Sequence, residues 1–204
     1  MVLRAIALNC TLKSSPAPSS TDKILREVMD ELKRHKVAGD IVRVADLNIK
    51  PGVTSDEGAG DDWPALRARI LAADILVVGS PIWLGQPSSI AKRVIERMDA
   101  FLDETDSRKR MPSFGKVAAV AIVGNEDGAH HCHAALFQAL NDVGFTLAAG
   151  AGTYWVGRAM EETDYKDLRK PHDKTVETTR MLAGNAAHLA ALLKATRYPG
   201  VAKT

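Results

Sequence analysis

The sequence predicts a doubly wound α/β fold: a five-stranded parallel sheet in the strand order 2-1-3-4-5, with helices on both faces. Strand-like and helix-like segments alternate along the 204 residues with few hairpin signals between them, as a parallel sheet requires. Two strand-like segments, residues 75–78 and 116–124, are apolar throughout, which is typical of central strands buried on both faces. A first loop suited to a ligand favours the order 2-1-3-4-5 over other doubly wound orders.

The composition bounds the class of protein. The apolar fraction of 46% and the charged fraction of 25% are ordinary for a globular chain, and the length suits one domain over residues 1–204. A net charge of +2 gives no indication of a strongly basic surface that would bind nucleic acid or an anionic membrane. The longest apolar runs fall well short of a membrane span, and the first residues carry no signal-peptide pattern. Cys10 and Cys132 show neither zinc nor redox-pair spacing, so a reduced, cytoplasmic protein is expected.

The first part of the chain predicts a strand at 2–9, a helix from 22 to about 36, and a second strand at 40–47. The second strand alternates in polarity, which indicates a sheet edge. Residues 10–21 between strand and helix are rich in hydroxyls and include Lys13. Such a loop is a good phosphate cradle, because free N–H groups, the helix dipole and hydroxyls converge there. A solvated loop with an ordinary Ser or Thr N-cap explains the same residues.

Two known phosphate-binding motifs are absent after the first strand. The sequence has no Gly-x-Gly-x-x-Gly there and no Gly-Lys-Ser or Gly-Lys-Thr P-loop. A dinucleotide-type Rossmann site and a P-loop nucleotide hydrolase are therefore disfavoured. A ligand in this loop would contact side-chain hydroxyls rather than glycine backbone.

The middle of the chain predicts a loop at 48–61 and a short helix at 62–71 before the central strand. This strand, 75–78, is expected to stop at residues 79–81, Gly-Ser-Pro, because glycine and proline rarely continue a central strand. A helix that begins after residue 87 and runs to about 102 follows.

A large aromatic residue, Trp83, follows the central strand on a loop. In open parallel sheets, ligands bind at the carboxyl ends of the strands, so Trp83 is a candidate to contact one. The alternative is that Trp83 simply caps the core from above.

The second half continues the alternation of strands and helices. The predicted elements are a strand at 116–124, a polar loop at 125–128, a helix at 129–143, a short strand at 145–148, a flexible stretch at 149–152, extended structure at 153–156, an irregular polar segment at 157–171 and an amphipathic helix from 173 to about 194. The tail at 197–204 is expected to fray.

The predicted order makes the first, third and fourth strands neighbours. Their carboxyl-end loops, 10–21, 81–86 and 125–128, then face one crevice. Together they offer a hydroxyl-rich anion cradle, an apolar and aromatic tip, and a polar glycine-containing loop. This combination suits a ligand with a phosphate tail and a large planar ring, such as FMN.

These stretches resemble those of the flavodoxin-like NAD(P)H-dependent FMN reductases and related quinone-reductase-type flavoproteins, over residues 2–193. Residues 19–21, Ser-Ser-Thr, look like the family's phosphate loop. Residues 79–85, Gly-Ser-Pro-Ile-Trp-Leu-Gly, look like its isoalloxazine loop, and 124–128, Gly-Asn-Glu-Asp-Gly, are similar to its third flavin-contacting loop. The first loop departs from the family, because Asn-Cys-Thr-Leu-Lys at 9–13 replaces a Gly-Ser-Pro-Arg-like run and Pro-Ala-Pro is inserted after it.

The resemblance implies an enzyme that passes a hydride from NADPH or NADH through bound FMN to a quinone, nitro compound, flavin or similar acceptor. It also implies a homodimer, for which Tyr154 and Trp155 could supply the surface. No catalytic side chain is predicted, because such transfer needs stacking geometry rather than an acid or base. The predicted cofactor-binding residues are Thr11, Lys13, Ser19, Ser20, Thr21, Pro81, Ile82, Trp83, Leu84, Gly85, Asn125, Glu126, Asp127 and Gly128.

Other chemical candidates are weaker. His130, His131, Cys132 and His133 are consecutive on a predicted helix and point to different sides, so no metal site is predicted. Cys132 has no partner arrangement that would make it a nucleophile. The run Arg-Lys-Arg at 108–110 is a solvated loop or, alternatively, a site for the 2′-phosphate of NADPH.

Two further functions stay open on the same fold. One is an electron-carrier flavodoxin, although such carriers are typically strongly acidic and this chain is not. The other is a flavin-free regulatory or interaction module.

Overall fold

The computed structural model describes residues 2–158 and 161–201. Its strands are β1 (Leu3–Asn9), β2 (Val37–Arg43), β3 (Ile75–Trp83), β4 (Gln86–Pro87), β5 (Val117–Gly124) and β6 (Thr146–Val156). Five of them form a parallel sheet in the order β2-β1-β3-β5-β6, and β4 pairs antiparallel with the end of β3. Because β4 is an extra hairpin strand, this order confirms the predicted 2-1-3-4-5.

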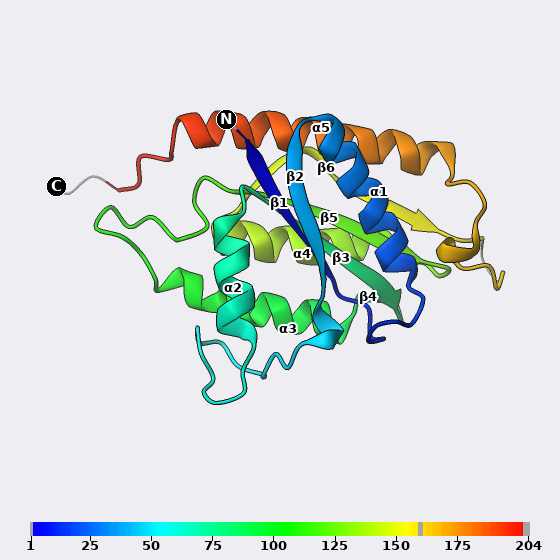
Figure 1. The fold of residues 1–204 in the computed structure, drawn as a ribbon, viewed down its shortest axis with the longest axis horizontal. Coiled ribbons are helices and arrows are strands. Elements are labelled where there is room, and N and C mark those ends of the chain that lie inside the picture. The colour runs from blue at the N-terminus through cyan, green and yellow to red at the C-terminus, as the bar shows by residue number, and fades with distance from the viewer. Residues whose placement is uncertain (1, 159–160, 202–204) are drawn as a thin grey trace.

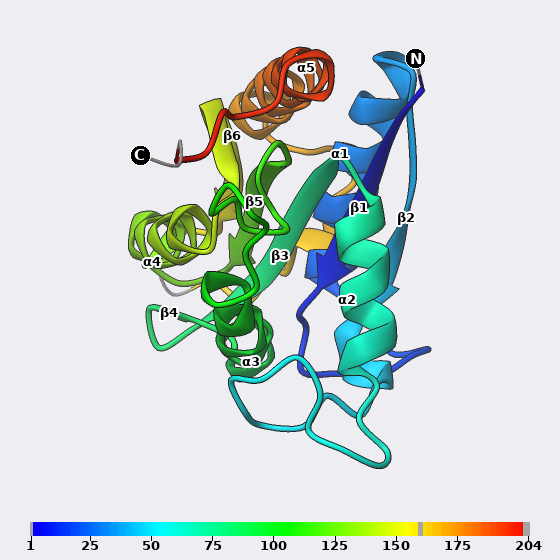
Figure 2. The same ribbon diagram turned by 90° about the vertical axis from the view of Figure 1, so that its left-hand side faces the viewer.

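Helices cover both faces of the sheet. α1 (Ser20–Arg34) and α5 (Asp173–Ala195) lie on one face, and α2 (Trp63–Ala72), α3 (Ser89–Met98) and α4 (Ala129–Asp142) lie on the other (Figure 1 and Figure 2). Alternate residues of β3 feed the two cores: Ile75 packs under α1 and α5, and Leu76 packs under the other three helices. Side chains alternate across a strand, so burial on both faces demands the continuous apolar run seen in the sequence.

The edge position of β2 is confirmed, but its bounds differ from the predicted 40–47. The strand starts at Val37, and a 3-10 turn at Val44–Asp46 replaces its expected end. Most of its first half is exposed, so polarity gave little signal for where the strand begins.

The expected stop of the central strand at residues 79–81 is wrong. β3 continues to Trp83, and Ser80 and Pro81 pair with β5. β1 ends its pairing opposite Gly79, so beyond that residue β3 has a neighbour on one side only. A proline is tolerated there because its missing N–H faces the open side.

The expected interruption of the strand at residues 149–152 is also wrong. β6 runs through it as one strand, and the irregularity is taken up by a register shift opposite Ala118 and Val120. Gly150 lies in this bulge with φ of +66°, a conformation that glycine adopts at low cost.

A long loop between β2 and α2 is fastened by a buried ion pair. The Arg97 guanidinium lies 2.8 Å from the Asp61 carboxylate, and both side chains are fully buried. Arg97 also donates to the carbonyls of Lys50 and Thr54. Asp61 accepts backbone N–H groups from Lys50 and Glu57 of the loop and from Trp63 at the start of α2. The loop is therefore ordered by polar contacts rather than by its own secondary structure.

The described residues also form three short 3-10 turns: Val44–Asp46, Asp99–Leu102 and Tyr165–Asp167. In the tail expected to fray, residues 197–201 have no regular secondary structure, and the Tyr198 ring packs on Phe114 while its hydroxyl bonds Thr146. Residues 202–204 lie outside the described residues. Across 2–158 and 161–201, no helix is both long and apolar enough to cross a membrane.

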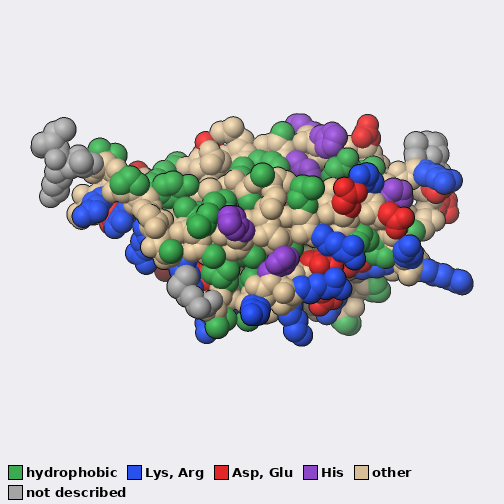
Figure 3. Space-filling view, turned by 90° about the horizontal axis from the view of Figure 1, so that it is seen from above, with side chains coloured by type: hydrophobic (Ala, Val, Ile, Leu, Met, Phe, Trp, Pro, Cys, Tyr) green, Lys and Arg blue, Asp and Glu red, His purple; other side chains and the backbone are tan. Residues whose placement is uncertain are grey.

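The surface over α5 carries charges of both signs. Near the start of this helix, acidic and basic side chains lie next to one another in the view from above (Figure 3). This mixture agrees with the small net charge of +2.

Candidate functional site

A pocket of about 320 Å³ lies at the carboxyl ends of β1, β3 and β5. It is lined by Thr11, Lys13, Pro18, Ser19, Ser20, Thr21, Pro81, Ile82, Trp83, Leu84, Val123, Gly124, Asn125, Glu126, Trp155, Asp164, Tyr165 and Lys166. The three loops that the strand order was expected to bring together therefore meet around one cavity. Its position is the one at which open parallel sheets bind ligands.

Of the predicted cofactor-binding residues, Gly85, Asp127 and Gly128 are not part of this lining. The two glycines allow the loops to approach: a Cβ on Gly128 would lie 2.6 Å from the Gly85 Cα. The Asp127 side chain is exposed, and its carboxylate accepts the Gly128 N–H. The two glycines therefore let the hairpin and the loop between β5 and α4 pack closely together.

The start of α1 forms one end of the pocket. Ser19 is the N-cap, and its hydroxyl accepts the Asp22 N–H at 3.1 Å. The backbone N–H groups of Ser20 and Thr21 have no hydrogen-bond partner among the described residues. Free N–H groups at a helix N-terminus, with its positive dipole end, favour an anion. The N-cap is therefore confirmed at Ser19, and the phosphate cradle stays a prediction, for which the next two residues present free donors.

A segment that sequence reasoning left as irregular closes over this end. We call residues 161–170 the strap. Lys23 on α1 donates to the carbonyls of Tyr165 at 3.0 Å and Leu168 at 2.6 Å, and its ammonium lies over the Tyr165 ring. The Tyr165 hydroxyl donates to the Glu27 carboxylate. Burial, and then this hydrogen bond, raise the pKa of Tyr165, so the hydroxyl keeps its proton. These contacts fix the strap to α1.

The strap brings a cation to the pocket. The backbone N–H of Lys166 donates to the Ser20 hydroxyl at 3.2 Å, and the side chain lines the cavity. Its ammonium lies 2.7 Å from Asp164 and 2.5 Å from Asp167, and these carboxylates raise the pKa of Lys166. The lysine is therefore fully charged at neutral pH. No sequence signal marked it, because it lies far along the chain from the loop it meets.

An apolar hairpin forms the other end. β3 and β4 are joined by Leu84 and Gly85, both with positive φ, as two-residue hairpin turns of type I′ require. Trp83 is 53% exposed and Leu84 is 91% exposed. The alternative that Trp83 caps the core is therefore wrong, and its ring stands at the mouth of the pocket.

Serine hydroxyls hold the hairpin against the first loop. The Ser88 hydroxyl donates to the Cys10 carbonyl at 2.6 Å and accepts the Ala91 N–H at the start of α3. The Ser88 N–H donates in turn to the Ser80 hydroxyl at 2.9 Å. All of these groups are buried, so the loops after β1 and β3 are coupled by satisfied hydrogen bonds.

The polar loop between β5 and α4 carries a buried acceptor. Glu126 lines the pocket, and its Oε1 atom is shielded from solvent without a hydrogen-bond partner among the described residues. An unpaired buried oxygen is costly unless a ligand supplies its partner.

The histidine and cysteine cluster on α4 has other roles. His133 is buried against Phe137 and Tyr154, and burial lowers its pKa to about 4. Burial, with the charge of Glu126, raises the pKa of Cys132 to about 11, so the thiol stays protonated. Within residues 2–158 and 161–201, no three His, Cys, Asp or Glu side chains gather in a way that could hold a metal ion.

The two aromatic residues expected to form a free surface pack within the chain instead. Tyr154 is half-buried and lies edge-on to His130 and His133. Trp155 packs on Tyr165 with ring centroids 5.3 Å apart and lines the pocket. The prediction that they are spare is therefore wrong, because the strap and α4 cover them.

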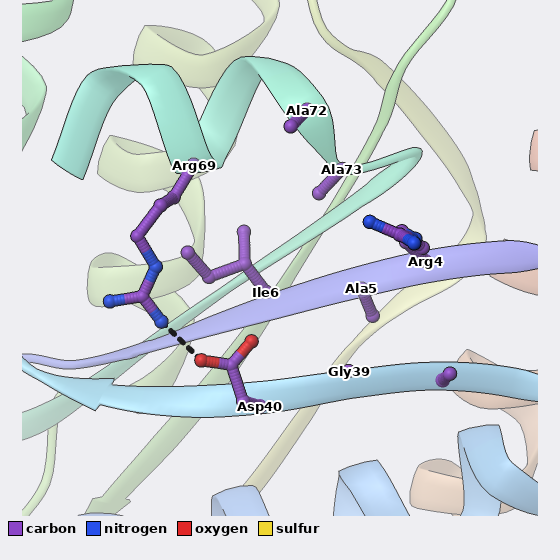
Figure 4. A pocket seen from close by; sticks show the side chains of 9 residues that line it. Arg4, Ala5, Ile6, Gly39, Asp40, Arg69, Ala72 and Ala73 are labelled. Atoms are coloured by element: carbon purple, nitrogen blue, oxygen red, sulfur yellow. Dashed lines mark hydrogen bonds and ion pairs between the residues drawn. The ribbon is translucent and has the colours of Figure 1, made fainter. Parts of the chain in front are cut away.

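A second hollow of about 380 Å³ lies toward the amino ends of the strands, between β1, β2 and α2. Figure 4 shows Arg69 of α2 reaching to Asp40 of β2, with the small side chains of Ala5 and Ala73 lying to one side of this ion pair. The opposite charges of Arg69 and Asp40 neutralise each other. We prefer the pocket at the carboxyl ends, where the unpaired N–H groups at the start of α1 point to a ligand.

Comparison with known proteins gives a family match and relatives that align over nearly the whole of this chain. The family model for NADPH-dependent FMN reductases matches residues 4–161. The chain is 32% identical over 208 residues to 8-demethyl-8-aminoriboflavin-5′-phosphate synthase of Streptomyces davaonensis, covering 97% of this chain and 81% of that protein. A crystal structure of RosB with bound 8-demethyl-8-formylriboflavin-5′-phosphate superposes with a TM-score of 0.88 at 32% identity, covering 97% of this chain and 82% of that one.

A further relative is longer than this chain. The divalent metal cation transporter MntH of Mycobacterium bovis is 36% identical over 200 residues, which cover 95% of this chain. The chain spans only 29% of that protein's length.

Proposed function

This chain belongs to the NADPH-dependent FMN reductase family, and we propose that it carries reducing equivalents from a reduced nicotinamide to a small acceptor such as a quinone, a nitro compound or free flavin. It is an oxidoreductase that uses FMN with NAD(P)H as electron donor. The observation that carries the proposal is the two-ended pocket, with N–H and hydroxyl groups that can bind an anion at α1 and an apolar hairpin at the opposite end.

The α1 end would hold the FMN phosphate. Ser20 and Thr21 offer free N–H groups and hydroxyls. The Lys166 ammonium, which is paired with Asp164 and Asp167, lies in the lining as a further donor, and Lys13 lines the same pocket. Hydrogen bonds from charged groups are the strong ones, so this donor set suits a phosphate.

The hairpin end would hold the ring system. Pro81, Ile82 and Trp83 present apolar surface to the cavity, and no charged residue occurs between Ser80 and Ser89. Such a wall suits a planar aromatic group and excludes water beside it. When bound, FMN supplies a ring that can accept a hydride from the nicotinamide and pass reducing equivalents to the acceptor. Trp83 then limits which planar substrates can lie at the mouth.

Steady-state kinetics tests the proposal with FMN-loaded protein. Donor and acceptor would enter beside Trp83 in turn, so double-reciprocal plots with NADPH and a quinone are expected to be parallel. Trp83→Ala should change acceptor turnover or flavin retention while the unfolding midpoint stays near that of wild type, because the ring is half exposed. Protein that holds FMN but oxidises no reduced nicotinamide with any acceptor would contradict the proposal and favour an electron carrier. A protein that binds no FMN would favour a flavin-free module.

A second candidate is an enzyme that modifies the flavin itself. The similarity to a flavin-phosphate synthase extends over nearly the whole chain, at 32% identity. In that case FMN is a substrate, and its mass should change during incubation. Mass spectrometry of the flavin recovered after turnover separates the two candidates: unchanged FMN supports the reductase, and a changed ring supports the synthase.

We further propose that the chain acts as a single flavodoxin-like domain, within the cytoplasm and as a homodimer. The two buried, unpaired cysteines support a reducing compartment. The exposed Trp83 and Leu84 at the pocket mouth, rather than Tyr154, support a second subunit there. A monomer mass by light scattering at micromolar concentration, with full activity, would contradict the dimer.

A further inference from the structure

We propose that Arg43, at the end of β2, is a positioning residue that holds the first loop, residues 10–19, in the shape that lines the pocket. The inference rests on the proposed function, because the ligand whose binding it affects is the FMN placed in that pocket. Arg43 is not part of the pocket lining, so it acts through the loop and not by touching the ligand.

The first step is that the loop has little apolar packing of its own. It joins the end of β1 to the start of α1 and forms neither helix nor strand, and residues 12–16 are exposed. A segment with few buried apolar contacts opens at low cost in free energy unless polar contacts hold it. The shape of this loop therefore depends on hydrogen bonds from neighbouring elements.

The second step is that Arg43 supplies such bonds. Its Nη1 atom donates to the Ala17 carbonyl at 2.7 Å and to the Ser14 carbonyl at 3.2 Å. Its Nη2 atom lies 3.9 Å from the Asp22 carboxylate in the first turn of α1. The Arg43 side chain is only 12% exposed, so water competes little for these contacts, and a charged donor makes strong hydrogen bonds. One guanidinium group thus ties the loop to α1.

The third step is that the chain just after β2 fastens the same part of the loop a second time. Asp46, in the 3-10 turn, accepts both the N–H and the hydroxyl of Ser15, each at 2.7 Å. Within the loop, the Ala17 N–H donates to the Ser14 carbonyl at 3.1 Å. The stretch from Ser14 to Ala17 is therefore held by its own turn and by two side chains from one neighbouring segment.

The fourth step connects the loop to the ligand. Thr11, Lys13 and Pro18 line the pocket, and Pro18 directly precedes the N-cap residue of α1. When Arg43 is replaced, open shapes of the loop compete with the shape that presents these residues. The apparent affinity for a ligand then falls with the fraction of protein that keeps the binding shape. Because the loop leads into the α1 end, where the phosphate is placed, FMN should be affected and riboflavin should not.

The test measures loop opening and flavin affinity in the same variants. Hydrogen–deuterium exchange of the flavin-free protein follows the hydrogen-bonded N–H groups of Ser15 and Ala17. Fluorescence titration gives the dissociation constants of FMN and riboflavin. Arg43→Met should speed exchange at both N–H groups and weaken FMN binding about ten- to a hundredfold, with riboflavin close to wild type. Arg43→Lys keeps a charged donor and should recover part of both losses.

Arg26→Met is the matched control. Arg26 pairs with the same Asp22 carboxylate at 2.6 Å, but its side chain is 69% exposed and its hydrogen bond runs to α1 rather than to the loop. This variant removes one positive charge beside the start of α1. Exchange and FMN affinity should therefore stay as in wild type, which separates the position of Arg43 from its charge.

The outcomes separate this inference from the proposed function. If wild type binds no FMN, the proposed function fails and the inference fails with it. If wild type binds FMN but either readout in Arg43→Met matches wild type, the inference alone is wrong. Equal losses for FMN and riboflavin would assign Arg43 a general structural role and would also overturn it. If Arg43→Met does not fold, Arg43→Lys is judged against wild type by the same criteria.

Discussion

Ser20 stands where the chain leaves its first loop and enters α1, with a free backbone N–H and a hydroxyl that accepts from Lys166. We expect Ser20→Ala to weaken FMN binding about ten- to a hundredfold, because one hydrogen bond to a charged phosphate is lost. Riboflavin lacks the phosphate, so its affinity should not change. Titration of both flavins against wild type and variant measures this, and equal losses for the two flavins would rule out a phosphate at Ser20.

His133 ties the stability of the fold to pH. Burial lowers its pKa to about 4, against an ordinary value of 6.5. The folded state therefore binds fewer protons than the unfolded state between these values, and its contribution to stability is complete above pH 6.5 and declines toward pH 4. We expect His133→Phe to flatten this part of the profile in urea unfolding series. His188→Asn, at an exposed position, is the matched control, and a profile unchanged by His133→Phe would contradict the assignment.

Residue chemistry near the first helix could be predicted because capping is local. Ser19, Ser20 and Thr21 are adjacent in sequence, and hydroxyls before an amphipathic helix indicate a helix start. Lys166 could not be found in this way, because its partner Ser20 lies 146 residues away in the sequence. Contacts of that kind follow from the sheet order and not from any local pattern.

Among the elements, the strap is the part that completes the pocket. We expect Lys166→Met to weaken FMN binding with little effect on riboflavin, because a charged donor at the phosphate end is removed. The effect should shrink as salt is raised, since an exposed or half-exposed charge is screened. Lys170→Met, an exposed lysine on the same strap, is the control. An equal loss in both variants would show that general charge, and not the position of Lys166, is responsible.

The loop before α2 depends on Asp61. Burial opposes its ionisation, but the N–H groups of Glu57 and Trp63 and the Arg97 guanidinium together lower its pKa to about 2. Asp61→Asn leaves Arg97 buried without a counter-charge, so we expect a loss of about 3–5 kcal/mol in the free energy of unfolding.

The same carboxylate gives a second readout in acid. The folded pKa lies below the unfolded value, so the stabilisation is present above about pH 4 and is lost as the pH falls toward 2. Asp61→Asn should lack this part of the acid profile, and Asp56→Asn, at an exposed position in the same loop, should keep it. Chemical unfolding at several pH values measures both effects. An Asp61→Asn variant with the same stability and the same acid profile as wild type would contradict the role of the Asp61–Arg97 pair.

Element types followed from the sequence more closely than element ends did. Continuous apolar runs identified β3 and β5, since only burial on both faces requires them. The end of β3 was missed because glycine and proline were weighed as strand breakers, and whether a strand has one neighbour or two at Pro81 is a property of the sheet. The continuity of β6 was missed for a similar reason, because pairing with β5 carries the strand across Gly150.

For the whole molecule, the alternation of strands and helices, together with a first loop suited to a ligand, predicted the sheet order and hence the place of the pocket. The surface expected around Tyr154 and Trp155 was not predictable, because whether an aromatic is free depends on what later segments cover it. The central claim is that this pocket holds FMN and that a reduced nicotinamide donates to it.

Anaerobic stopped-flow absorbance tests that claim most directly. FMN-loaded protein is mixed with NADPH and, in a separate experiment, with NADH. We expect at least one of the two to bleach the bound flavin, and a quinone added afterwards to restore the absorbance. Flavin that remains bound and stays oxidised for minutes with both donors would contradict the account.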